Sequence, residues 1–133
     1  MIRYKSGYKY HLEETYTLHD HVLHGLLVVT DYIIIENGFI NIRKGYAWDG
    51  PSGPAIDTKN FMRGSLVHDA LYQLMRHGFV DISFRKKADQ LLARICREDG
   101  MTYVRAWWVY AGVRIFAGKA ASGKAVRRVI TAP

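Results

Sequence analysis

At residues 32–43 the chain reads Tyr32-Ile-Ile-Ile-Glu-Asn-Gly-Phe-Ile-Asn-Ile-Arg43. β-Branched residues on both sides of the Asn37-Gly38 pair favour extended strands with a half-buried pleated surface. Asn-Gly fits the two positive-φ positions of a type I′ turn, so we predict a tight two-residue hairpin here. We expect further strands over residues 8–18 and 26–29, where apolar residues alternate or run together.

The character of the chain changes at Gly45. Residues 45–54 hold three glycines and two prolines, which indicates a shaped loop. Helical spacing of apolar residues follows over residues 61–76, 84–98 and 103–116, with Ser83 as the expected N-cap of the second helix and Gly100 just past its end. The sequence therefore predicts an α+β fold: an N-terminal antiparallel β region followed by a Gly/Pro loop and two to three packed helices.

The third expected helix is rich in aromatic residues. Its apolar positions at helical spacing are Val104, Trp107, Trp108, Ala111 and Ile115. We interpret them as a stripe that faces the core. The alternative is a helix at a membrane surface, which aromatic rings next to arginines favour.

Length and charge limit the class of protein. At 133 residues and 49% apolar composition, we expect one domain over residues 1–118, with a basic tail over 119–133. A net charge of +7 favours contact with anionic membranes or polyanions, but no nucleic-acid-binding motif is present, so we expect no specific nucleic-acid binding. One cysteine excludes an internal disulfide. The absence of a signal core or of a long apolar run predicts a cytoplasmic location without a transmembrane helix.

The residues that suggest chemistry lie on the first two expected helices. His68 and Tyr72 are four residues apart and share one helical face, whereas Asp69 is rotated by about 100°. A short loop through Gly78 is expected to bring Asp89 back beside them on an antiparallel helix. A carboxylate that accepts one imidazole N–H fixes the tautomer and leaves the other ring nitrogen as a general base. Asp69 and carbonyls of the glycine-rich loop suit a hard cation such as calcium.

Two motifs recur together in a known group of proteins. Trp48-Asp49-Gly50-Pro51-Ser52 followed by His68-Asp69-Ala70-Leu71-Tyr72 resembles a family of small phage- and prophage-encoded proteins of unknown function. The likeness extends from about Tyr46 to Arg114. It implies a phage or prophage origin and residence in the host cytoplasm or in a virion. We expect Trp48, Asp49 and Ser52 to belong to the Gly/Pro loop, where Trp48 either forms the wall of a pocket or covers a helix end.

The same residues resemble, more weakly, the calcium-dependent phospholipases of the secreted and parvoviral type. That resemblance implies that His68 is the catalytic base, supported by Tyr72 and Asp89. It also implies calcium binding by Asp69, with Gly50 and Gly53 in the metal loop. The usual Gly-x-Gly order of that loop is replaced here by Gly-Pro-Ser-Gly-Pro.

Two functions from different classes follow. The leading hypothesis is a hydrolase-like site that carries out calcium-assisted ester hydrolysis of phospholipid at a membrane surface. The alternative is a non-enzymatic phage accessory, either a virion or assembly component or a host-directed binding protein, whose partner is another phage or host protein. In the alternative, His68 and Asp69 are structural residues that hold the loop onto the helix.

Overall fold

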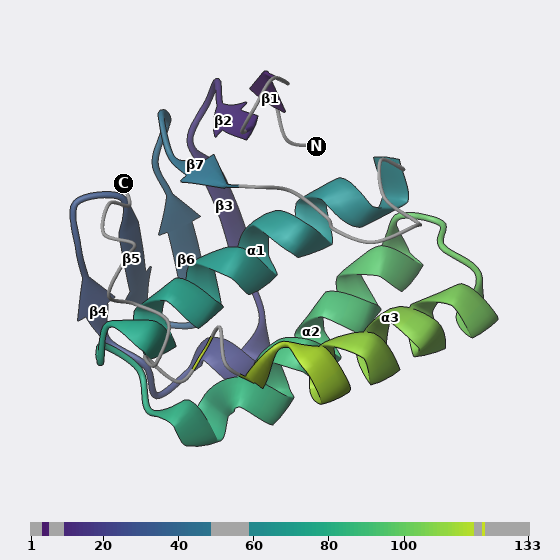
Figure 1. Ribbon diagram of the computed structural model, residues 1–133. Helices are drawn as coiled ribbons and strands as arrows, with labels where there is room; N and C mark the ends of the chain where they lie inside the picture. The colour runs from purple at the N-terminus through teal and green to yellow at the C-terminus, as the bar shows by residue number, and fades with distance from the viewer. Residues whose placement is uncertain (1–3, 6–9, 49–58, 119–120, 122–133) are drawn as a thin grey trace. The chain divides into compact units, whose positions relative to one another are not determined.

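The computed structural model describes residues 4–5, 10–48, 59–118 and 121. The chain divides into two compact regions, residues 1–49 and residues 50–130. Strands make up the first region and three long helices the second (Figure 1), which confirms the predicted α+β class. The boundaries expected for the domain and its tail, 1–118 and 119–133, stay a prediction. The loop residues Asp49, Gly50, Ser52 and Gly53 lie outside the described residues.

Within the described residues, the strand region contains two antiparallel sheets. The three-stranded sheet has the order β1 (Tyr4–Lys5), β2 (Tyr10–Leu12), β7 (Ala47–Trp48). The four-stranded sheet has the order β3 (Tyr16–His19), β6 (Phe39–Ile42), β5 (Ile33–Glu36), β4 (Val28–Val29). A single 3-10 turn, η1 (His21–Leu23), lies between β3 and β4.

The hairpin predicted at Asn37-Gly38 is confirmed. Both residues have positive φ, 53° and 81°, and Glu36 pairs with Phe39 across a two-residue turn. The register places Ile33 opposite Ile42 and Ile35 opposite Ile40. All four isoleucines are buried, so one face of the β5–β6 pair is apolar, as the period of two requires.

The helical region contains α1 (Lys59–Arg76), the 3-10 turn η2 (Ile82–Phe84), α2 (Arg85–Glu98) and α3 (Tyr103–Phe116). Helix α2 packs on α1 and runs back along it, and α3 packs on α2 (Figure 1). Glycines with positive φ end the first two helices: Gly78 at 83° and Gly100 at 100°. At each end the next residue donates its N–H to a carbonyl five positions back, which satisfies the last turn.

The predicted N-cap of α2 is wrong. Ser83 lies inside η2, where its N–H donates to the Asp81 carboxylate at 2.9 Å, and α2 starts after Phe84 without a side-chain cap. The Asp81 carboxylate caps η2, which directly precedes α2. The side-chain cap therefore lies at the start of the 3-10 turn and not at the start of the α-helix. Thr102 caps α3 by accepting the N–H of Arg105 at 3.2 Å.

Helix α3 presents a different face to the core from the one expected. Its core residues are Ala106, Val109 and Val113, which pack with Phe61, Leu92, Cys96 and Met101. The expected core stripe is wrong, because four of its members, Val104, Trp107, Trp108 and Ile115, are exposed. The fifth, Ala111, is half-buried. Apolar residues surround most of this helix, so their spacing alone did not identify the packed side.

Helices α1 and α2 approach closely at Gly64. A Cβ added there would lie 2.9 Å from Leu92 Cδ1 and 3.0 Å from Cys96 Sγ, both in the buried core. Arg63 also connects α1 to the end of α2. Its guanidinium donates to Glu98 at 2.8 Å and to both carboxylate oxygens of Asp99 at 3.0 Å. The absence of a side chain at residue 64 is therefore a condition of this packing.

We predict that Gly64→Ala destabilises the protein and that Gly112→Ala, a matched change in α3, stabilises it. Both changes gain about 1 kcal/mol of helix propensity. At residue 64 the added Cβ also overpacks the core, which destabilises by about 1–3 kcal/mol. At residue 112 this loss is absent, because a Cβ there meets nothing within 4 Å. Urea unfolding of both variants measures the two changes in free energy, and equal shifts in the same direction would contradict the close approach.

Candidate functional site

The carboxylate of Asp89 is the centre of the candidate site. Asp89 lies on α2 and is fully buried. Its Oδ1 accepts hydrogen bonds from Tyr72 Oη at 2.5 Å and from His68 Nε2 at 2.7 Å. Its Oδ2 accepts one from Arg114 Nη1 at 3.0 Å. The site therefore joins one residue of α2 to partners on α1 and α3.

The contact expected between His68 and Asp89 is confirmed, and so is the shared face of His68 and Tyr72, whose ring centroids are 4.1 Å apart. An ionised carboxylate only accepts hydrogen bonds, so His68 carries its proton on Nε2. Nδ1 then presents a lone pair, and it has no hydrogen-bond partner within the described part of the chain. His68 as a whole is 7% exposed, so the imidazole is largely shielded from water.

Two arginines complete the site, and sequence reasoning missed both of them. Arg114 bonds to Asp89 directly. Arg85 donates from Nε to Tyr72 Oη at 3.0 Å, and from Nη2 to the carbonyls of Val113 and Arg114 at 2.7 and 2.8 Å. Arg85 precedes Asp89 by four residues, which is a detectable helical pairing. Arg114 lies 25 residues away on another helix, and no local pattern predicts it.

The electrostatics of the site keep Asp89 ionised and Tyr72 protonated. Burial pushes the pKa of Asp89 upward, but the hydrogen bonds from His68, Tyr72 and Arg114 outweigh burial and hold the pKa below its usual 3.8. Burial, with the hydrogen bond and charge of Asp89, raises the pKa of Tyr72 well above its usual 10. At neutral pH, Tyr72 is therefore a hydrogen-bond donor to an ionised carboxylate.

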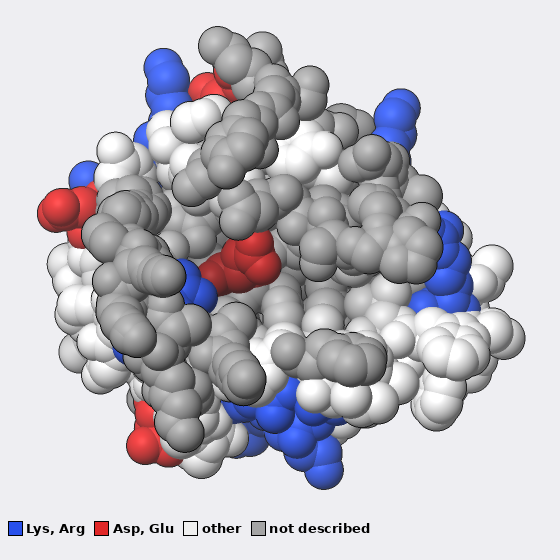
Figure 2. Space-filling view, viewed as in Figure 1, with Lys and Arg blue, Asp and Glu red and all other residues white. Residues whose placement is uncertain are grey.

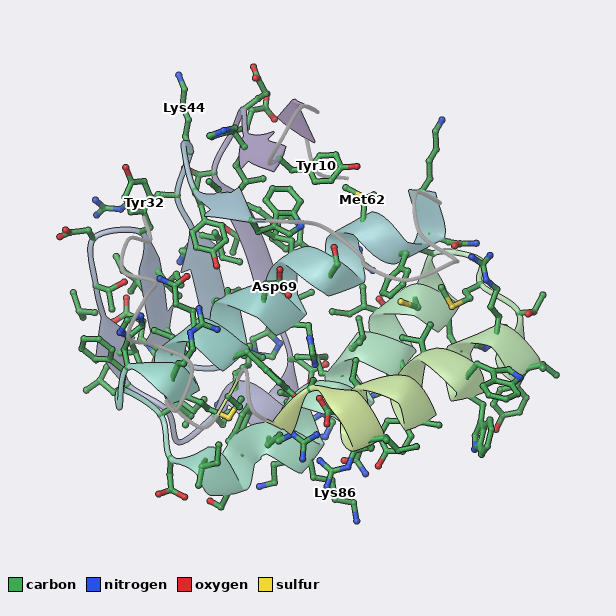
Figure 3. The ribbon with its side chains drawn as sticks, viewed as in Figure 1. Tyr10, Tyr32, Lys44, Met62, Asp69 and Lys86 are labelled. Carbon is green, nitrogen blue, oxygen red and sulfur yellow. The ribbon has the colours of Figure 1, made fainter. Side chains whose placement is uncertain are left out.

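Asp69 lies in the middle of α1, one residue from His68, and is partly exposed (Figure 3). Its carboxylate has the chemistry of a calcium ligand. The other predicted ligands, Gly50 and Gly53, lie outside the described residues, as do Asp49 and Ser52. Among the described residues no group of three or more His, Cys, Asp or Glu side chains is arranged to hold a metal. Of the predicted calcium ligands, the structure therefore describes Asp69 alone.

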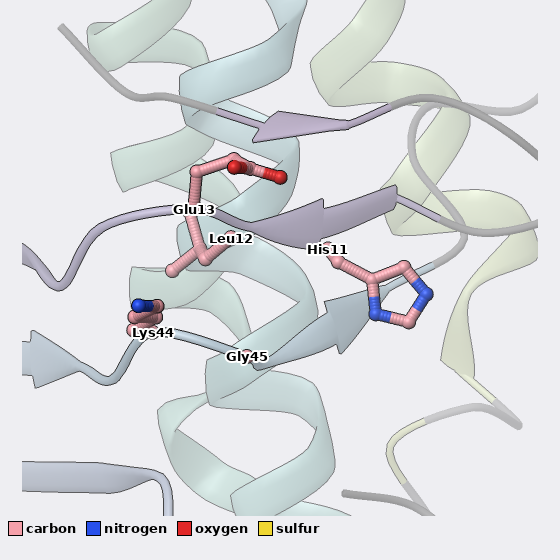
Figure 4. Close-up of a pocket in the computed structure, with 5 residues that line it drawn as sticks. All are labelled: His11, Leu12, Glu13, Lys44 and Gly45. Atoms are coloured by element: carbon pink, nitrogen blue, oxygen red, sulfur yellow. The ribbon is translucent and has the colours of Figure 1, made fainter.

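The strand region holds the remaining residue of the predicted loop and a surface pocket. Trp48 is buried in β7, with its ring 5.6 Å from that of Tyr10. The pocket is lined by His11, Leu12, Glu13, Lys44 and Gly45 (Figure 4). None of the predicted site residues that the structure describes is among these five.

Cys96 is not a candidate nucleophile. It is fully buried between α1 and α2, and burial together with the nearby Asp99 raises the pKa of its thiol to about 12. A thiol with this pKa has a negligible thiolate fraction at neutral pH.

No helix in the described part of the chain is long and apolar enough to cross a membrane.

Comparison with known proteins gives one match. Residues 26–113 match the model of a family described as a protein of unknown function (DUF1353). The matched segment includes His68, Tyr72, Arg85 and Asp89 and ends one residue before Arg114. No curated protein and no solved structure matches the chain.

We predict that Asp89→Asn destabilises the protein at pH 7 by about 1–3 kcal/mol, because it removes the anion to which His68, Tyr72 and Arg114 donate. The folded pKa of Asp89 lies below 3.8, its usual value. The stabilisation is therefore complete above that pH and is lost as the pH falls through the folded pKa. Urea unfolding from pH 7 to pH 2 should show a fall in stability below about pH 4 that is weaker in the variant.

The matched control is Asp81→Asn. The Asp81 carboxylate also has a lowered pKa, held down by the hydrogen bonds that it accepts from Ser83, but Asp81 is exposed just before η2. Its replacement should change stability much less than the replacement of Asp89. Equal stability of Asp89→Asn and the wild type at pH 7 would contradict the central role of the buried carboxylate.

Proposed function

Because the chain belongs to the DUF1353 family, whose function is unknown, we propose an activity from the site itself: hydrolysis of carboxylic esters, with phospholipid as the substrate class. The observation that carries the proposal is the hydrogen bond from His68 Nε2 to Asp89 at 2.7 Å, which leaves Nδ1 as the basic atom. The resemblance of His68-Asp69-x-x-Tyr72 and the later Asp89 to calcium-dependent phospholipases supports phospholipid as the ester.

In the proposed reaction, His68 Nδ1 takes a proton from water while the water oxygen attacks the ester carbonyl carbon. Asp89 stabilises the imidazolium that forms, and Tyr72 and Arg114 hold Asp89 in place. The tetrahedral intermediate then collapses, its carbon–oxygen bond to the leaving alcohol breaks, and Nδ1 returns the proton to the leaving oxygen. The products are a fatty acid and a lysophospholipid.

We propose calcium as the cofactor, held by the Asp69 carboxylate and by backbone carbonyls of Gly50 and Gly53. When bound, this cation supplies stabilisation of the negative charge on the carbonyl oxygen. The proposed setting is a phage or prophage product that acts in the host cytoplasm or on a virion. Trp48, Asp49 and Ser52 belong to the loop segment of the same proposal.

We predict that His68→Gln abolishes hydrolysis of a soluble short-chain phosphatidylcholine in the presence of calcium, with a loss of about 10²–10⁴-fold in kcat. A glutamine amide still donates a hydrogen bond to Asp89 but offers no basic nitrogen, so the fold should survive. His77→Gln is the matched control, because His77 is exposed just after the end of α1. Fatty-acid release measures activity, and thermal unfolding measures the fold.

Asp69→Asn separates the metal from the base. We expect it to raise the calcium concentration needed for half-maximal activity, whereas His68→Gln should leave calcium binding by calorimetry unchanged. A wild-type protein that releases no fatty acid at any calcium concentration would refute the proposed hydrolysis. Activity that is unchanged by His68→Gln would refute the role of the imidazole.

The second candidate function is the non-enzymatic phage accessory, with a phage or host protein as its partner. The observation that favours it is the connection of all three helices through Asp89, since such a network braces a fold whether or not it is catalytic. This alternative predicts that His68→Gln lowers the unfolding temperature while no ester is hydrolysed by either protein.

A further inference from the structure

Helix α3 exposes a large apolar face. Its exposed members are between 60% and 77% accessible: Tyr103, Val104, Trp107, Trp108 and Ile115. Isolated apolar residues on a protein surface are common, but a cluster that includes two tryptophans and a tyrosine on one short helix is not. We call these five residues the α3 outer face.

The five residues lie on one side of the helix. At about 100° per residue they fall within an arc of roughly 140°. Ala106, Val109 and Val113 lie on the opposite side and pack into the core. Helix α3 thus has two apolar sides, and in the described part of the chain only one of them is buried. Figure 2 shows uncharged side chains projecting around the start of α3.

The charge around the α3 outer face indicates what covers it. The chain as a whole carries a net charge of +7. The Arg97 guanidinium lies 5.3 Å from the centre of the Tyr103 ring. Lys and Arg side chains also gather below the end of α3, where Figure 3 labels Lys86 (Figures 2 and 3). This charge complements an anionic surface.

The aromatic residues of the α3 outer face favour a lipid bilayer as the anionic surface. Tryptophan and tyrosine favour the headgroup layer of a bilayer, where an apolar ring and a polar N–H or O–H are both accommodated. A helix of 14 residues is about 21 Å long, which is shorter than the roughly 30 Å apolar layer of a bilayer. It therefore suits a position in the plane of the interface, with its exposed apolar side toward the acyl chains.

We propose that the α3 outer face docks the protein onto a bilayer that contains anionic phospholipid. The docking goes beyond the proposed hydrolysis and does not rest on it, since neither His68 nor Asp89 takes part. The apolar side chains that enter the acyl boundary are Val104, Trp107, Trp108 and Ile115. Basic side chains beside the α3 outer face, such as Arg97, contact the lipid phosphates.

The test uses the full chain and two kinds of vesicle, phosphatidylcholine alone and phosphatidylcholine with phosphatidylglycerol. Sedimentation with vesicles should show binding to the anionic vesicles that weakens in high salt. The double change Trp107→Ser and Trp108→Ser should weaken this binding by more than about tenfold. The matched control is Phe79→Ser, which removes an aromatic side chain that is 55% exposed in the turn after α1 and should leave binding unchanged.

A measurement on the unmodified protein guards against misfolding of the double variant. Brominated anionic lipids should quench much of the tryptophan fluorescence, because two of the three tryptophans lie on the α3 outer face and Trp48 is buried. No quenching, or equal binding by the wild type and the double variant, would overturn the proposal. A dimer that the double variant abolishes, without vesicle binding, would assign the face to a second copy of the chain. Capture of a phage or host protein without vesicle binding would likewise overturn it.

Docking and catalysis are separable in the same experiments. His68→Gln should bind anionic vesicles as the wild type does. The double tryptophan variant should hydrolyse the soluble short-chain ester at the wild-type rate. Loss of vesicle binding therefore bears on the α3 outer face alone, and loss of soluble-ester hydrolysis bears on the His68 site alone.

Discussion

The buried carboxylate of Asp89 is the constraint on which the helical region depends. A charge that is removed from water is tolerated only when hydrogen bonds and an opposite charge replace the lost hydration. Asp89 obtains these from His68, Tyr72 and Arg114, which come from two other helices. The three helices must therefore keep one mutual arrangement, because a shift of any of them would leave a buried charge without its partner.

The same constraint sets the orientation of α3 about its own axis. Arg114 points to Asp89, and Arg85 donates to the carbonyls of Val113 and Arg114 at the end of the helix. These contacts hold the side with Val109 and Val113 against α1 and α2. Trp107 and Trp108 then have to face outward. The exposed aromatic face is thus a consequence of the polar network as well as of core packing.

Local rules predicted much of the fold, and interactions between distant residues account for what they missed. The Asn37-Gly38 hairpin and the end of α3 at Phe116 follow from turn chemistry and helical periodicity, which involve neighbours in sequence. The contact of His68 with Asp89 followed because one short turn connects their helices. The packed side of α3 and the role of Arg114 depend on contacts between helices, and a helix with apolar residues on most of its circumference gives no clear periodic signal for either.

The hydrogen bonding of His68 is relevant to whether the network around Asp89 has only a structural role. Buried ion-pair networks are often no more stabilising than well-packed apolar residues of similar volume. His68 Nδ1 is not one of the fully buried side-chain atoms that lack a hydrogen-bond partner in the described part of the chain, so its lack of a partner does not count as a stability cost. In the described part of the chain, His68 Nε2 is paired with an anion and Nδ1 has no partner. An imidazole oriented on one side and left available on the other is the arrangement that a general base needs. The proposed hydrolysis and a purely structural role therefore differ in what they require of His68 Nδ1, because only the proposed general base uses its lone pair.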